Sequence, residues 1–221
     1  MALNAKNILV GASPLYLSTK DSTDAAYVEN MLDKGTVAFT KGAKAAVALD
    51  ASAAVRNVGF TNNGLQITYN PSYGSVTVDQ LLDTAKLFKE SMEVMIATEL
   101  AEGTLENVMA VFGQASSTKS GTLSKGASAN DNVDEVLGLE AGALGVAPTE
   151  RQLFAIGQAP TEVTPNTERV YYARRVLSVQ QSQFSLARNA ATTFPVTFRL
   201  LPDGNYAGSE YGKIIDRVTK N

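Results

Sequence analysis

Four carboxylates lie in two spaced pairs that could support acid–base chemistry. Glu93 and Glu99 share one face of an alternating segment, residues 91–100, and Asp79 and Asp83 lie close together before it. A glycosidase needs two carboxylates that face each other across a cleft. A solvated strand face produces the same spacing without chemistry, and we favour that interpretation over a carbohydrate-active enzyme.

The sequence lacks the residue types on which most catalytic and metal sites depend. It contains no histidine and no cysteine, which removes the usual general base, the thiol nucleophile and the commonest metal ligands. It contains no glycine-rich phosphate-binding motif. The stretch NDNVDE, residues 130–135, lacks the glycine and the distal glutamate of an EF-hand calcium loop. We therefore predict no catalysis, no cofactor and no metal.

Alternating apolar residues predict a mainly β chain. Hydrophobic residues make up 44% of the 221 residues, enough for a large core without disulfides. Apolar residues alternate over 58–60 and over 65–69, on either side of Asn62-Asn63-Gly64. Because glycine tolerates a positive φ, this pattern predicts a β-hairpin that reverses at 62–64. Residues 81–90 break the alternation and fit a short helix or a loop.

One helix is predicted over residues 104–112. Thr104 is a suitable N-cap, Glu106 complements the helix dipole, and Gly113 stands where a C-terminal cap is expected. Four apolar residues follow helical spacing, so we predict that all four are buried on one face: Leu105, Val108, Met109 and Phe112.

The last third of the chain predicts further strands. These lie within residues 151–160, 169–187, 191–203 and 211–218, and the second has a bulge near Arg174-Arg175. The sum predicts a β-sandwich or partly closed barrel flanked by one α-helix. We expect one domain over 1–221, with an extended arm or hairpin at about 20–55 and a flexible loop at about 114–130.

Charge is divided unevenly along the chain, which has a net charge of −3. Residues 56–113 contain three basic and seven acidic residues, and residues 151–221 contain nine basic and five acidic ones. Opposite charges on different surfaces suit self-association, although chance asymmetry on a solvated surface gives the same counts.

Two adjacent arginines follow two adjacent tyrosines, Tyr171-Tyr172-Ala173-Arg174-Arg175, which raises the possibility of stacking on nucleic acid. Successive strand residues point to opposite faces, so the four side chains do not form one patch. We favour a structural role, in which Arg174 and Arg175 form salt bridges between subunits.

The sequence contains no apolar run long enough to span a membrane, so no membrane insertion is expected. The start MALNAKNILVGAS has a short apolar patch and no strong basic flank, which favours a cytosolic start over a signal peptide.

Three stretches, in this order, resemble the tail tube (major tail) proteins of long-tailed bacteriophages. They are VGFTNNGLQITYNPSYGSVTVDQ, ATELAEGTLENVMAVFG and YYARRVLSVQQSQFSLARNAATTFPVTFRLLPD. The resemblance covers about residues 56–113 and 168–203, and residues 20–55 and 114–150 match less well. No stretch is specific alone, and the resemblance rests on their order.

The resemblance implies a structural virion protein, assembled in the cytoplasm of a host bacterium and located in the virion tail. Such proteins form homohexameric rings of β-sandwich subunits that stack into a tube for DNA ejection. The implied partners are other copies of the chain, further tail proteins (terminator, baseplate or tip, and sheath if the tail contracts), and double-stranded DNA that passes without specific binding. An acidic inner wall would repel phosphate, and Glu93 and Glu99 are the candidate lumen-facing residues.

Two other functional classes stay open from the sequence. A tube similar to that of type VI secretion systems, or a capsid-associated structural protein, would share these elements. A carbohydrate-active enzyme that uses the carboxylate pairs is the more distant alternative.

Overall fold

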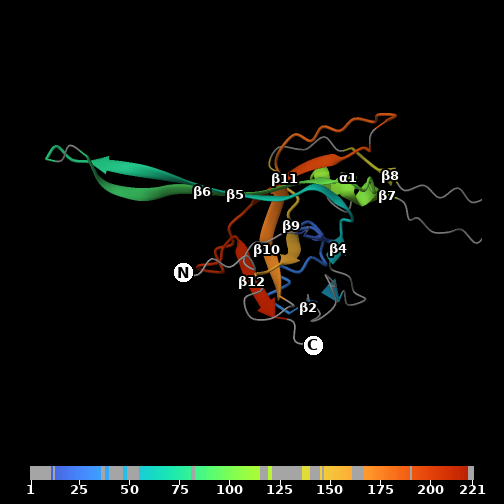
Figure 1. Cartoon of the computed structure of the whole chain (residues 1–221), viewed down its shortest axis with the longest axis horizontal. Helices are drawn as coiled ribbons and strands as arrows, with labels where there is room; N and C mark the ends of the chain where they lie inside the picture. The colour runs from blue at the N-terminus through green and yellow to red at the C-terminus, as the bar shows by residue number, and fades with distance from the viewer. Residues whose placement is uncertain are drawn as a thin grey trace, which may run out of the picture.

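The chain is mainly β and is built around one antiparallel sheet (Figure 1). The computed structural model describes residues 11, 13–35, 38–39, 47–48, 55–80, 83–114, 119–120, 136–139, 145, 147–160, 167–189 and 191–218. The eight strands of the sheet are β1 (Leu15–Ser18), β4 (Val55–Asn57), β5 (Thr61–Thr77), β6 (Thr84–Leu100), β9 (Arg151–Gln158), β10 (Thr167–Ser178), β11 (Phe194–Leu200) and β12 (Gly212–Val218).

The sheet is open in the single subunit. Its order is β4-β1-β9-β10-β11-β6-β5, with β12 also paired to β10. Two short pairs stand apart from it, β2 (Ala38–Phe39) with β3 (Val47–Ala48) and β7 (Lys119–Ser120) with β8 (Val136–Leu137). The prediction of a mainly β fold with one helix is confirmed, whereas the sheet of one chain does not close into a barrel.

Strand β10 lies in the middle of the sheet and pairs with three other strands. One edge pairs β9, and the other pairs β12 over Thr167–Ala173 and then β11 over Val176–Ser178. The register of the β9 pairing shifts between Ala173 and Val176, which confirms the predicted bulge at Arg174-Arg175. A bulge re-aims side chains locally, and here it turns the two arginines toward different surroundings.

Alternation along the strands supplies two cores, one on each face of the sheet. Leu15 and Leu17 lie in the larger core, which includes apolar residues from β6, β9, β10, β11 and the helix. Tyr16, between them, points to the opposite face and packs in a smaller core with Phe154 and Tyr172. Residues 28–32 cover that smaller core.

The predicted turn at Asn62-Asn63-Gly64 is wrong, because β5 runs straight through it. Asn63 and Gly64 have φ values of 60° and 67°, and the register with β6 shifts between Asn62 and Gln66. Positive φ values serve a β-bulge as well as a turn, so the local signal was real but belonged to a bulge. The chain continues to Thr77, and β6 begins at Thr84, within the segment for which a helix or loop was expected.

The one α-helix among the described residues, α1 (Leu105–Val111), begins and ends close to the predicted residues. Thr104 accepts a hydrogen bond from the Asn107 amide, and Gly113 has a φ of 66° after the last turn. Asn107 is fully buried and donates from its side chain to the backbone oxygens of Val58 and Glu102, 2.8 and 2.9 Å away. These bonds anchor the helix to the segments that directly follow β4 and β6.

The predicted apolar face of α1 is rotated from the face that packs. Met109 is buried, Leu105 and Val108 are half-buried, and Phe112 is 41% exposed. The inward face instead carries Asn107, Ala110 and Val111, because the side chain of Asn107 must reach backbone carbonyls beneath the helix. The expected burial of Phe112 is therefore wrong.

This rotation predicts that two alanine substitutions on α1 lower the stability of the protein by different amounts. Met109→Ala should lower the free energy of unfolding by about 2–5 kcal/mol, since the methionine side chain is buried. Phe112→Ala should cost clearly less than the roughly 3–5 kcal/mol of a fully buried phenylalanine. Urea denaturation of both variants checks the ordering, and a larger loss for Phe112→Ala would contradict the packing described.

The predicted arm at about 20–55 and loop at about 114–130 lie only partly within the described residues. Residues 20–35 form a run of turns, and β2 pairs with β3 in the expected hairpin. Residues 36–37, 40–46, 49–54, 115–118 and 121–130 lie outside the described part of the chain, so the mobility expected there stays a prediction.

Candidate assembly surface

Strands β5 and β6 form a two-stranded arm that projects well beyond the sheet (Figure 1). β11 pairs β6 only at residues 95–100, so the more distant part of β6 has β5 as its sole partner strand among the described residues. From Tyr69 to Thr77, beyond the pairing with β11, the arm spans roughly 27 Å at the usual rise per strand residue. A two-stranded ribbon alone is marginally stable in water, so an arm of this length needs a partner surface.

The two faces of the arm differ in polarity, because directly opposed residues point to the same side. Tyr69 opposes Val94, and Pro71 opposes Met92, so their face continues from the larger core. Farther out, this same face carries Tyr73 opposite Lys89. The ammonium of Lys89 lies 5.8 Å from the centre of the Tyr69 ring, which places both on the apolar face.

The opposite face is polar over the inner half of the arm. It carries the β5 residues Gln66, Thr68, Asn70 and Ser72. Asn70 directly opposes Glu93. The arm is therefore amphipathic, with an apolar side that no described residue of the same chain covers near its end.

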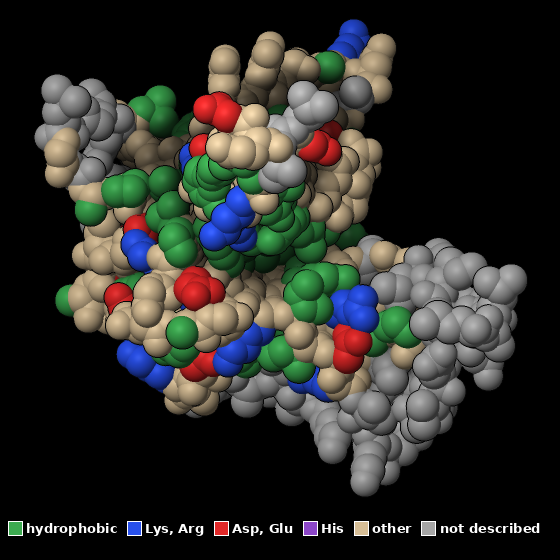
Figure 2. All heavy atoms as spheres, turned by 90° about the vertical axis from the view of Figure 1, so that its left-hand side faces the viewer, with side chains coloured by type: hydrophobic (Ala, Val, Ile, Leu, Met, Phe, Trp, Pro, Cys, Tyr) green, Lys and Arg blue, Asp and Glu red, His purple; other side chains and the backbone are tan. Residues whose placement is uncertain are grey.

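Large apolar side chains are exposed all along the arm. Leu87 is 64% and Tyr73 60% exposed, and the full set is Ile67, Tyr69, Tyr73, Val76, Val78, Leu87 and Phe88. Figure 2, which views the molecule from the side on which the arm projects, shows hydrophobic side chains gathered there beside lysines and carboxylates. Tyr73 and Leu87 lie on the face of Tyr69, whereas Val76 and Phe88 lie on the other face. Exposed apolar side chains gathered on one element in this way are typical of an interaction site.

Gly74 shapes the outer part of the arm. A Cβ at this position would lie 2.6 Å from the Phe88 ring and 2.5 Å from a Glu90 carboxylate oxygen. Phe88, directly opposite, therefore lies across the glycine, an arrangement in which an aromatic residue compensates for a strand glycine.

The free edges of the sheet are protected to different degrees. β5 forms one end of the sheet, and its residues 61–77 contain no charged side chain. β12 also has a free edge, but it carries cross-strand ion pairs, Arg169 with Asp216 at 2.6 Å and Arg217 with Glu168. Charges on an edge oppose unwanted strand pairing, so of these two edges β5 is the one left available for a partner.

Glu93 and Glu99 lie on the polar face, as their alternation predicted. Arg199 approaches Glu93 to 3.6 Å, and the Glu99 carboxylate accepts hydrogen bonds from Asn62 and Asn63. Six strand residues separate the two carboxylates by roughly 20 Å. A glycosidase pair is about 5–9.5 Å apart, so these two do not form one.

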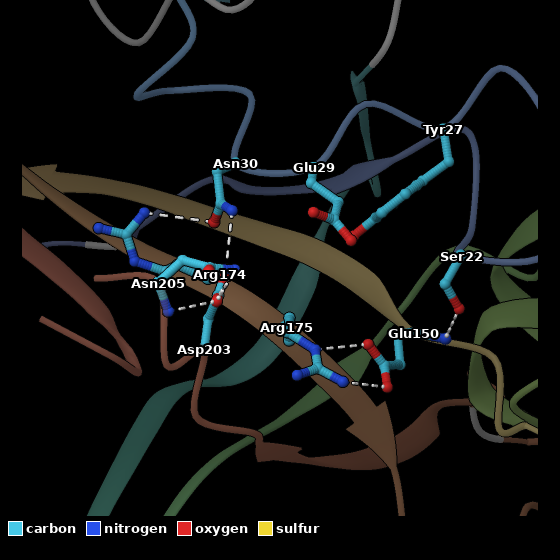
Figure 3. Close-up of a pocket in the computed structure, with 9 residues that line it drawn as sticks. All are labelled: Ser22, Tyr27, Glu29, Asn30, Glu150, Arg174, Arg175, Asp203 and Asn205. Atoms are coloured by element: carbon cyan, nitrogen blue, oxygen red, sulfur yellow. Dashed lines mark hydrogen bonds and ion pairs between the residues drawn. The ribbon is translucent and has the colours of Figure 1, made fainter. Parts of the chain in front are cut away.

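Arg175 lies at a polar pocket of about 180 Å³ (Figure 3). Its guanidinium donates two hydrogen bonds of 2.7 Å to Glu150 and one of 3.1 Å to the Pro202 carbonyl. The Glu150 carboxylate raises the pKa of Arg175. The side chain stays 39% exposed, so its predicted contact with another subunit stays a prediction.

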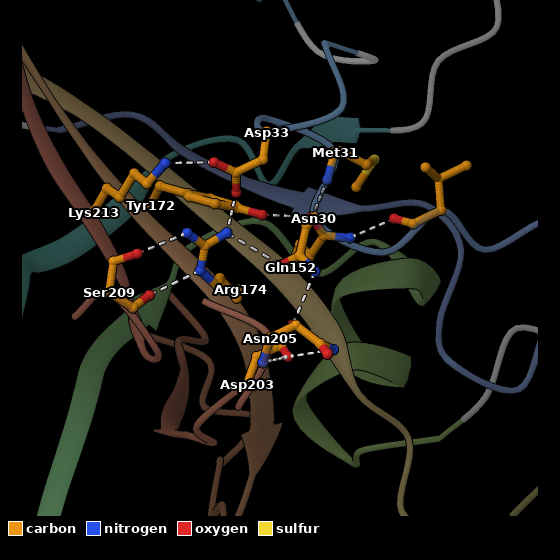
Figure 4. A network of polar contacts seen from close by, with 11 residues as sticks. Asn30, Met31, Asp33, Gln152, Tyr172, Arg174, Asp203, Asn205, Ser209 and Lys213 are labelled. Atoms are coloured by element: carbon orange, nitrogen blue, oxygen red, sulfur yellow. Dashed lines mark hydrogen bonds and ion pairs between the residues drawn. The ribbon is translucent and has the colours of Figure 1, made fainter. Parts of the chain in front are cut away.

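Arg174, one residue away, is fully buried inside the subunit (Figure 4). Its guanidinium donates to Asp33, to Asn30 and to both the carbonyl and hydroxyl oxygens of Ser209. It also stacks on the Tyr206 ring, 3.8 Å from the ring centre. The expected salt bridge from Arg174 to a neighbouring subunit is therefore wrong, because the β10 bulge directs this side chain inward.

Asp33 is the acidic partner at the centre of this network. Burial raises the pKa of its carboxyl, but hydrogen bonds from Lys213 and Arg174 outweigh burial and hold the pKa below its ordinary value. The network joins residues 30–33, β10 and β12 (Figure 4), so its role is to fix the covering segment against the sheet.

Sequence reasoning missed the outer half of the arm. From the sequence, residues 81–90 were interpreted as a break in the strand pattern. The structure has a bulge near Glu90, and beyond it Leu87 and Lys89 continue the alternation of the apolar face. The available signal was the absence of charge over residues 61–77, which is unusual for a long solvent-exposed strand.

No protein-family model matches the chain, and no curated protein matches it at a significant level. Among the described residues, no helix is long and apolar enough to span a bilayer, and no group of three or more acidic side chains is placed to hold a metal ion.

Proposed function

We propose that this protein is a structural tube subunit, which assembles into stacked hexameric rings to form the tail tube of a long-tailed bacteriophage. The tube is the conduit for DNA ejection, and the subunit has no catalytic role. The hexamer and the phage tail come from the sequence resemblance described above. Assembly itself is supported by the subunit's own surface.

The single observation that carries the proposal is the amphipathic β5–β6 arm. It combines an exposed apolar face with an uncharged free strand edge, and both are liabilities in a monomer. Pairing with another copy removes both liabilities at once. The sheet of one chain is open. Strands from neighbouring copies would extend it into a closed wall.

A tube needs two kinds of contact between identical subunits. A head-to-tail contact that closes on itself makes a ring, and an axial contact that does not close makes an open stack. The β4 and β5 ends of the sheet are different surfaces, which suits the ring contact. The arm extends far enough to reach beyond its own subunit, which suits contacts between rings.

The polar face of the arm is our candidate for the inner wall. Glu93 and Glu99 lie on it, while the inner part of the opposite face joins the larger core and its outer part is left for a neighbouring copy to cover. DNA phosphates that met a basic wall would bind and release slowly, whereas carboxylates repel them. Arg199 lies beside Glu93 and offsets its negative charge. The net negative charge of the wall therefore depends on Glu99 as well as on Glu93.

The proposal is tested by the assembly state of the purified chain. We expect light scattering to report species much larger than 23.4 kDa, and negative-stain electron microscopy to show rings or tubes with a central channel. A monodisperse monomer at every protein concentration and salt condition would overturn the proposal.

Charge reversal on the candidate wall gives a functional prediction. In a phage that carries the altered gene, Glu93→Lys with Glu99→Lys should allow tube assembly but reduce DNA delivery, since several new cations would hold the phosphates. A double glutamine variant is the control, because it removes the same carboxylates without adding positive charge. Normal infectivity of the lysine variant, with tubes of normal length, would exclude Glu93 and Glu99 from the wall.

A further inference from the structure

We propose that the apolar end of the arm docks into a groove beside α1 on a second copy of the chain. This inference rests on the proposed function and assigns the surface that receives the arm. An arm with exposed apolar side chains projects from one end of the chain, and an uncharged groove lined by both apolar and polar residues lies toward the other end.

The groove lies between the C-terminal end of α1 and the segment that follows β10. It has a volume of about 560 Å³ and is lined by Val111, Phe112, Gln114, Leu139 and residues 178–182. Pockets of about 300–1,000 Å³ accept drug-sized groups, so this groove has room for more than one large side chain.

Aromatic rings form one side of this region. Phe112 stacks with Phe184 at 6.3 Å between ring centres, and Phe184 contacts Phe194 at 4.7 Å. Leu139 and Val179 are 78% and 43% exposed. Phe112, whose exposure contradicted the sequence-based prediction, therefore forms part of the proposed docking groove.

The groove and the β5 strand of the arm are both uncharged. None of the residues that line the groove is charged, and β5 is uncharged along its whole length. Docking Tyr73 and Leu87 therefore removes apolar area from water, while Lys86, Lys89 and Glu90 of β6 keep their charged ends in solvent at the rim. Glutamines 114, 180 and 181 supply hydrogen-bonding groups at the rim, where the arm backbone has unpaired donors and acceptors.

The positions of the arm and the groove require the contact to form between two copies and allow it to repeat along a stack. The arm extends away from the sheet on one side, and α1 lies toward the opposite side of the molecule (Figure 1). An arm that points away from α1 does not fill the groove of its own chain. A contact between opposite ends of identical subunits leaves a free arm and a free groove at each step, so it propagates as a stack.

Cysteine crosslinking tests the contact cleanly, because the natural chain has no cysteine. Leu87→Cys and Val179→Cys are prepared as separate variants, mixed in equal amounts and treated with a short bis-maleimide crosslinker. Leu87→Cys mixed with Ile214→Cys is the matched control, since Ile214 is 66% exposed on β12, away from the groove. Mass spectrometry of the crosslinked peptides identifies the joined positions.

We expect the 87–179 crosslink to exceed the 87–214 crosslink by about tenfold, as a docked pair has a far higher effective concentration. Equal yields, or a predominant crosslink between two copies of position 87, would overturn the docking. Electron microscopy of the same mixtures separates the two proposals. Tubes without the 87–179 crosslink refute the docking alone, the crosslink without tubes refutes the tube alone, and the absence of both refutes both.

Discussion

Replacing residues 73–90 by an Asn-Gly turn should leave the subunit folded and abolish its assembly. Ser72 and Ser91 are directly opposed on β5 and β6, and a two-residue Asn-Gly connection suits such a pair. The change removes Tyr73, Leu87 and Phe88 but keeps the buried half of β6. Loss of several apolar anchors should raise the concentration needed for assembly by about 100-fold or more.

Two matched point variants separate the arm from a general surface effect. Leu87 and Ile214 are 64% and 66% exposed, but only Leu87 lies on the arm. Leu87→Ser should weaken assembly, and Ile214→Ser should leave it unchanged, as measured by light scattering across a concentration series. Equal behaviour of the two variants, or full assembly of the shortened chain with native circular dichroism, would remove the arm from the assembly surface.

Arg174→Met should be the most destabilising single change described here. Its guanidinium is fully buried, and its loss would leave the Ser209 carbonyl and the Asn30 side-chain oxygen without their donor. Removing one partner of a buried ion pair costs about 3–5 kcal/mol, a large share of the roughly 5–15 kcal/mol that holds a domain together. Urea denaturation at pH 7 measures the loss.

The neighbouring arginine supplies the control. Arg175→Met removes a partly exposed pair with Glu150, and such pairs contribute about 0–1 kcal/mol. The pKa of Asp33 is lowered by the fold, so its ion pair contributes fully above its unfolded pKa of about 3.9. The gap between wild type and Arg174→Met should therefore shrink as the pH falls through the lower, folded pKa. Equal losses for Arg174→Met and Arg175→Met would contradict the burial of Arg174.

Local patterns predicted most strands, because period-two alternation directly reports a half-buried sheet. β11 is the clearest case, with Phe194, Val196, Phe198 and Leu200 all buried on one side. The bulge in β10 and the ends of α1 were also predictable, since each depends on a few adjacent residues. The carboxylates Glu93 and Glu99 were placed on the correct strand face for the same reason.

Features that depend on distant contacts were not predictable. Asn63 and Gly64 signal positive φ, but only pairing with β6 decides that they form a bulge rather than a turn. Phe112 fits the apolar helical pattern, yet the polar bonds of Asn107 set which face of α1 points inward. Arg174 and Arg175 look equivalent in sequence, and only the bulge and residues 30–33 place one inside and one outside.

The central claim is that β5–β6 arms from many copies build the wall of a tube, with their polar faces inward. Electron cryo-microscopy of the assembled protein, at a resolution that traces strands, tests this claim most directly. The account predicts a central channel lined by the arms, with Glu93 and Glu99 facing it and the apolar face of each arm covered by protein. A polymer without a channel, arms on its outer surface, or a channel lined by the face of Tyr69 and Tyr73 would contradict it.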